Sequence, residues 1–141
     1  MESHLTDIAR VIQLAVAPVF LLTAIATMIG AMNVRLGRIV DRRRVVLGRA
    51  GSVGDADSAV ELATLARRSR LVYFAIFCAV LAALLVCMVV AAAFLGALLS
   101  VDLARLVATL FIAAMVAMIA ALGLFLREIF LAVRDGTHNR R

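Results

Sequence analysis

The polar residues that could do chemistry gather in one stretch of the chain, between residues 35 and 70. All 15 basic residues are arginines, and nine of them lie in this stretch. Arginine binds phosphate and carboxylate groups through a planar fork of N–H donors. The residues expected to contact inorganic anions or anionic lipids are those of the pattern that opens the stretch: Arg35, Arg38, Asp41 and Arg42.

A second polar pattern lies upstream, on one face of the first apolar helix. Two threonines one helical turn apart either line a water-filled passage or donate back to their own helix. A face with small polar residues can also serve helix packing in a membrane, so both roles stay open. The candidate pore-lining residues are Gln13, Val16, Phe20, Thr23, Thr27 and Gly30.

No enzyme signature is present in the sequence. It contains no nucleophile beside a base, no glycine-rich phosphate loop and no carboxylate pair in an apolar setting. Cys78 and Cys87 are nine residues apart, which places them on opposite faces of one helix. We therefore expect no enzymatic activity, no cofactor and no metal site.

The elements that must position these residues are three long apolar runs. They span residues 14–34, 71–99 and 106–126, and none contains an acidic or basic residue. A bilayer core about 30 Å thick needs roughly 20 apolar residues in a helix. The sequence therefore predicts an all-α membrane protein with three transmembrane helices.

The placement of the arginines predicts how these helices are oriented. Nine arginines separate the first two runs, and four follow the third, whereas Arg10 and Arg105 stand alone on the other side. Arginine-rich short loops mark the cytoplasmic side. We expect a membrane protein with its N-terminus outside and both the 35–70 loop and the C-terminus in the cytoplasm. Arginines beside apolar runs favour lipid head groups as partners and do not indicate nucleic acid.

The chain is expected to form one domain, residues 1–141, with helices over about 6–47, 59–99 and 102–134. The first two helices extend beyond their apolar runs and form a cytoplasmic helical hairpin over residues 35–70. Folding this hairpin at Val53 predicts pairs of Asp41 with Arg67 or Arg68, and of Arg44 with Glu61. Capping residues are expected at Ser58, Ser100 and Asp102.

Small residues recur at four-residue spacing in the second and third runs, namely Ala92 with Gly96, and Ala113, Ala117 and Ala121. Such residues allow helix backbones to approach closely. A three-helix unit has little surface for all of these contacts, so we expect a homo-oligomer.

Two segments resemble a known family. They are residues 12–22, with the sequence IQLAVAPVFLL, and residues 33–42, with the sequence NVRLGRIVDR. The segments, and the spacing Arg-x-x-Arg-x-x-Asp-Arg in the second, resemble the bacterial membrane family catalogued as domain of unknown function 2721. The resemblance implies one helix, a basic cytoplasmic hairpin and two further helices, and it implies no activity. With the topology above, it leads us to expect a bacterial inner-membrane protein.

These patterns favour a homo-oligomeric ion channel that is lined by the first helix and prefers anions. Rings of arginine at a pore mouth favour anions, and Arg35 and Arg38 would form such a mouth. The alternative is a non-conducting scaffold or accessory subunit whose arginine-rich hairpin binds a protein partner or anionic lipid.

Overall fold

The computed structural model describes residues 2–50 and 56–138, and in this part of the chain all regular structure is helical. The helices are α1 (Glu2–Ala50), α2 (Ala56–Leu99) and α3 (Ala104–His138). Each contains a segment long and apolar enough to cross a membrane. The prediction of three such helices is therefore confirmed.

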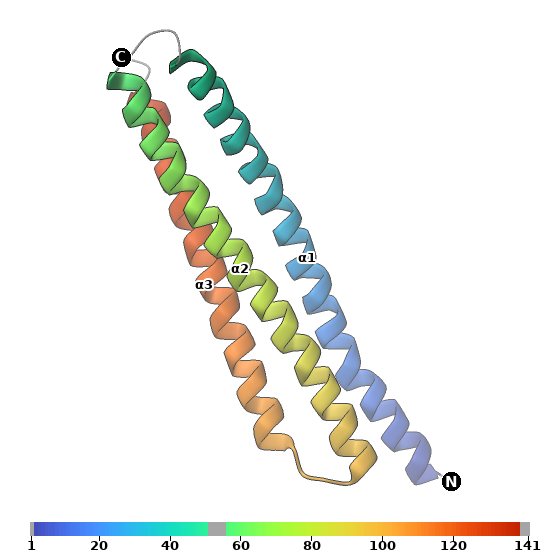
Figure 1. Cartoon of the computed structure of the whole chain (residues 1–141). Coiled ribbons are helices and arrows are strands. Elements are labelled where there is room, and N and C mark those ends of the chain that lie inside the picture. Colours follow the sequence, from blue (N-terminus) through green and yellow to red (C-terminus); the bar gives the residue numbers. More distant parts are fainter. Residues whose placement is uncertain (1, 51–55, 139–141) are drawn as a thin grey trace.

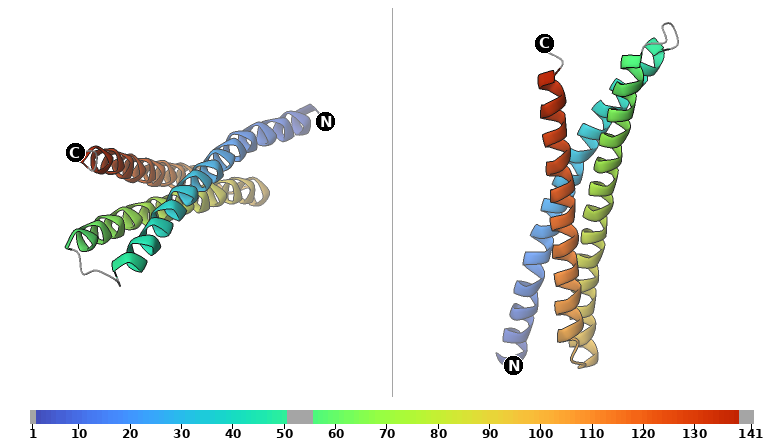
Figure 2. Two further views of the ribbon diagram at one scale, coloured as in Figure 1. Left: turned by 90° about the horizontal axis from the view of Figure 1, so that it is seen from above. Right: turned by 90° about the vertical axis from the view of Figure 1, so that its left-hand side faces the viewer.

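The helices run antiparallel in chain order (Figure 1). Helix α2 is central, because it packs against both α1 and α3 along much of its length. The N-terminal end of α1 and the C-terminal end of α3 each diverge from the other two helices (Figure 2). One end of the bundle carries the α2–α3 turn, and the opposite end carries the arginine-rich parts of the chain.

Buried residues recur every seven positions in all three helices, which is the spacing of left-handed coiled coils. A helix needs such a repeat to keep one face toward its neighbour. Helix α1 has one series, and so does α3: Ile25, Met32, Ile39 and Val46 in α1, and Ala114, Ala121 and Glu128 in α3. Helix α2 lies between them and has two series, Leu65, Val72, Ala79 and Val86, and Ala75, Ala82 and Val89. The last position of the α3 series holds an acid.

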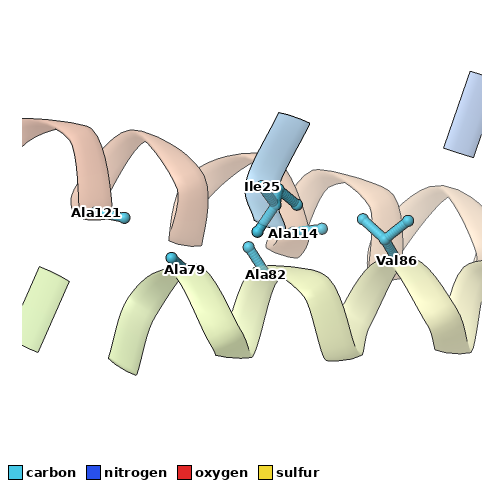
Figure 3. Close-up of a cluster of buried hydrophobic side chains, with 6 residues drawn as sticks. All are labelled: Ile25, Ala79, Ala82, Val86, Ala114 and Ala121. Carbon is cyan, nitrogen blue, oxygen red and sulfur yellow. The ribbon is translucent and has the colours of Figure 1, made fainter. Parts of the chain in front are cut away.

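The core of the apolar part is made mainly of small side chains. Ala79 and Ala82 of α2 face Ala114 and Ala121 of α3, and Ile25 of α1 reaches between the two helices (Figure 3). Alanines at these positions allow the helix backbones to approach closely. Of the residues predicted to form small-residue contacts, Ala121 is buried within the chain and Ala113 is exposed.

The turn between α2 and α3 is closed by three local features. Ser100 has a left-handed φ of 55°, and the Val101 amide donates to the Gly96 carbonyl at 3.1 Å, which is the Schellman ending of a helix. A Cβ at Gly96 would lie 3.2 Å from the Val101 carbonyl oxygen. The Asp102 carboxylate then accepts from the Ala104 amide at 3.0 Å. Asp102 thus caps α3 as predicted, whereas Ser100 ends α2.

The observed helices differ from the predicted ones mainly at their ends. Helix α1 extends to Ala50 and α2 begins at Ala56, so the predicted cap Ser58 lies inside the first turn of α2. Helix α3 begins at Ala104, because Asp102 stands outside it as the cap. We call the parts of the helices beyond their apolar runs the arginine end, comprising residues 35–50, 56–70 and 127–138.

Candidate functional site

An acidic side chain lies at the centre of the arginine end. The Glu128 side chain is only 1% exposed and accepts from arginines on both other helices. Arg35 Nη1 of α1 donates to Oε2 at 3.3 Å, and Arg68 Nη2 of α2 donates to Oε1 at 2.9 Å. One carboxylate therefore joins all three helices.

The two arginines differ in their surroundings. The Arg35 guanidinium also lies 5.5 Å from the centre of the Phe125 ring, an arrangement suited to a cation–π contact. Its side chain is 42% exposed, whereas that of Arg68 is 19% exposed. Arg68 Nε is buried and has no hydrogen-bond partner among the described residues. Arg68 thus keeps one donor unsatisfied beside Glu128.

A third ion pair lies farther from the apolar runs. Arg42 Nε of α1 donates to Glu61 Oε1 of α2 at 2.8 Å, and both side chains are exposed. The predicted pairs of Asp41 with Arg67 or Arg68 and of Arg44 with Glu61 are wrong. Within residues 2–50 and 56–138, Asp41 is exposed and forms no ion pair, since Arg68 binds Glu128 and Glu61 binds Arg42.

A cavity of about 340 Å³ opens beside these ion pairs. We call it the arginine pocket. The side chains of Ile39 and Leu65 form part of its wall, and its charged lining residues are Arg35, Arg38, Arg42, Arg68 and Glu128. With four arginines and one glutamate, the lining carries a formal charge of +3. The pocket therefore combines the residue types and the net charge of an anion site.

The candidate pore-lining residues lie on a different face. All six are exposed, with Phe20 at 72%, because this face of α1 points away from α2 and α3. Thr23 Oγ1 donates to the Val19 carbonyl at 3.0 Å, and Thr27 Oγ1 donates to the Thr23 carbonyl at 2.9 Å. Gly30 has open space around its Cα. Nothing else in the described chain covers this polar face of α1.

The four residues expected to contact anions separate into two groups. Arg35, Arg38 and Arg42 all line the arginine pocket, whereas Asp41 does not. Arg35 faces α3, where it binds Glu128, and its side chain is 42% exposed. Arg38 is exposed and forms no ion pair within the described residues.

Sequence reasoning missed the residue on which the site is built. Glu128 follows the third apolar run by two residues, and it continues the seven-residue series of Ala114 and Ala121. Arg68 likewise continues the α2 series of Ala75 and Ala82. The sequence signal that could have identified this site is the presence of Arg68 and Glu128, with opposite charges, at core positions of the seven-residue repeat. That signal is hidden in the sequence, because the runs are apolar on every face and show no repeat.

The described residues contain no cluster of three His, Cys, Asp or Glu side chains that could hold a metal ion. Glu128 and Glu61 at the arginine end instead form ion pairs with arginines. The lining of the arginine pocket offers fixed positive charge and N–H donors.

Comparison with known proteins gives a single finding. The comparisons with curated proteins and with solved structures find no significant match. A family model described as a protein of unknown function, DUF2721, matches residues 15–136. The matched range includes all of the apolar runs except Leu14, the arginine pocket and Glu128. The chain therefore belongs to the DUF2721 family of proteins of unknown function.

Proposed function

We propose that this protein assembles with copies of itself in a bacterial inner membrane and forms an ion pore that prefers anions. The observation that carries the proposal is the uncovered polar face of α1, with Thr23 and Thr27 at its centre. Copies arranged with this face toward a common axis would enclose hydroxyl groups and Gly30. Arg38, exposed beyond the same face, would then stand near one mouth of the pore.

The proposed orientation places the arginine end in the cytoplasm. The arginines at this end outnumber those near the α2–α3 turn, where Arg105 stands alone, as the positive-inside rule requires. Under this proposal the N-terminus and the α2–α3 turn lie outside.

The orientation is tested by cysteine labelling at two exposed positions, Asp57→Cys and Val101→Cys. In intact cells an impermeant maleimide should label only the Val101→Cys protein, with the wild type giving the background of Cys78 and Cys87. After permeabilisation both variants should react. Labelling of Asp57→Cys in intact cells would reverse the orientation.

Conduction is tested by ion flux in proteoliposomes containing the full chain. Thr27→Val keeps the shape of the side chain and removes its hydroxyl, which favours dewetting of a narrow pore. Flux should fall at least about tenfold, while assembly is retained. Thr109→Val is the matched control, because Thr109 is an exposed threonine of α3 with the same type of bond, to the Arg105 carbonyl.

The preference for anions is tested by Arg38→Glu. Reversing the charge at a pore mouth reverses the local field, so the ratio of chloride to potassium permeability should fall. Wild-type liposomes that remain tight to chloride, potassium and protons across voltage and tension would end the pore proposal.

The second candidate is a non-conducting scaffold or accessory subunit that binds a cytoplasmic partner or anionic lipid through its arginine end. The hydroxyls of Thr23 and Thr27 favour it, because both are already satisfied by carbonyls of α1 and need no water. In that case neither threonine substitution changes ion flux, and the polar face of α1 contacts lipid or another helix.

A further inference from the structure

We propose that the arginine pocket is a binding site for a phosphate group, held jointly by α1 and α2 and organised by Glu128 of α3. This site lies between the helices of one chain, and it shares only Arg38 with the proposed pore. It does not require that the chain conduct ions. The argument rests on charge, on the size of the cavity and on its position relative to the apolar runs.

The first observation is the excess of positive charge. Glu128 is shared by Arg35 and Arg68, and Glu61 binds Arg42. Arg38 has no ion pair within the described residues, although it lines the same cavity. The two acids therefore do not neutralise the four arginines, and the excess positive charge favours an anion in the pocket.

Glu128 has a positioning role in this arrangement. Each of its oxygens accepts from a different arginine, at 3.3 Å from Arg35 and at 2.9 Å from Arg68. These bonds hold two guanidinium groups on one side of the cavity that would otherwise repel each other. Arg68 lines the cavity, and its Nε is buried without a hydrogen-bond partner among the described residues.

The second observation is the size of the cavity. A volume of about 340 Å³ is at the lower end of the range for small-molecule sites and is far larger than a halide ion needs. Phosphate oxygens match the paired N–H donors of arginine, which can bind them in bidentate fashion. The combination of several arginines and a roomy cavity favours a phosphate-bearing group over a bare halide.

The third observation is position along the helices. Arg35 directly follows the apolar run of α1, Arg68 lies three residues before that of α2, and Glu128 lies two residues after that of α3. All three runs thus end at one level, and the pocket lies there. In a membrane this is the level of lipid phosphates. Exposed Arg38 and Arg42 also leave the pocket accessible to phosphate from water.

The test is calorimetric titration of the purified full chain in an uncharged detergent with three probes. Dihexanoyl phosphatidic acid presents a lipid phosphate, dihexanoyl glycerol presents the same chains without it, and inorganic phosphate presents the group alone. Tighter binding of phosphatidic acid than of inorganic phosphate identifies a lipid as the source. Equal binding of the two identifies a phosphate from solution.

The site is assigned with a matched pair of variants that remove one positive charge each. Arg38→Gln removes a pocket residue, and Arg43→Gln removes an exposed arginine outside the pocket. Loss of a charged hydrogen-bond donor should raise the dissociation constant at least about tenfold for Arg38→Gln. For Arg43→Gln it should rise less than about threefold.

Arg38 is exposed and takes no part in the Glu128 ion pairs. The Arg38→Gln protein should therefore keep the wild-type unfolding midpoint, so that weaker binding by this variant does not reflect misfolding. The proposal is overturned if neither phosphate probe binds, or if dihexanoyl glycerol binds as tightly as phosphatidic acid. It is equally overturned if the two variants weaken binding to the same extent, which would indicate general surface attraction.

Discussion

The same seven-residue repeat runs through two regions of this molecule and is filled differently in each. In the apolar part the repeat positions hold small residues such as Ala82 and Ala114, and the helices pack directly against each other (Figure 3). At the arginine end two positions of the repeat hold Arg68 and Glu128, and a cavity opens beside them. Long charged side chains separate helices that alanines bring together.

The two regions also differ in what stabilises them. Lipid is as apolar as the helices, so association in the apolar part depends on close packing. At the arginine end, where water is available, burial of Ile39, Val46 and Leu65 adds a hydrophobic contribution. The Glu128 ion pairs lose much of their attraction to desolvation, so we assign them a larger role in fixing the register of α3 than in net stability.

The largest effect should come from removing the buried acid. Glu128→Gln leaves Arg35 and Arg68 without their shared counter-charge. Loss of one partner costs about 3–5 kcal/mol in fully buried pairs, and we expect the lower end of this range because the Arg35 side chain is 42% exposed. The free energy of unfolding, measured by SDS titration in mixed micelles with circular dichroism, should fall accordingly. Glu61→Gln is the control, because its ion pair with Arg42 is exposed.

A double replacement separates charge from packing. Arg68→Met combined with Glu128→Leu removes the two more buried charges and keeps much of the volume. Only Arg35, whose side chain is 42% exposed, then lacks its partner, so the double variant should recover most of the stability lost in Glu128→Gln. A double variant as unstable as the single one would show that the ion pair itself stabilises the fold.

The second largest effect is expected in the alanine core. Ala82→Leu inserts a larger side chain at a fully buried position, in the cluster that also contains the fully buried Ile25, Ala79 and Ala114. Overpacking of this kind costs about 1–3 kcal/mol. Ala91→Leu, on an exposed face of α2, should leave the unfolding midpoint unchanged. Equal destabilisation by both variants would mean that helix approach does not depend on Ala82.

The contrast between the regions also explains which features could be predicted from sequence. Charge-free runs of about 20 residues are a direct physical requirement of a membrane, so the three helices were predictable. The pairings at the arginine end were not, because they were derived from α1 and α2 alone. Glu128 of α3 occupies Arg68, and Glu61 pairs with Arg42 instead of Arg44. The contact of Arg68 with Glu128 could not be found by pairing α1 with α2 alone.

A smaller effect is expected at the α2–α3 turn, which joins the two helices of the alanine core. Asp102→Ala removes the acceptor for the Ala104 amide and should lower the free energy of unfolding by about 1 kcal/mol. Ser100→Gly should act in the opposite direction by about 0.5–1 kcal/mol, since glycine tolerates the left-handed backbone at this position. Unfolding by SDS titration checks both signs.

The smallest effect should come from the exposed ion pair at the arginine end, and it provides the sharpest contrast with Glu128. Arg42 and Glu61 are 2.8 Å apart, but their side chains are 50% and 40% exposed. A double-mutant cycle with Arg42→Gln and Glu61→Gln should therefore give a coupling of only about 0.2–1 kcal/mol. Salt should screen this coupling, whereas the coupling of Arg68 with buried Glu128 should change little between 0.05 and about 0.5 M salt. If the Arg42–Glu61 coupling equals the Glu128 coupling and resists salt, burial does not distinguish the two ion pairs.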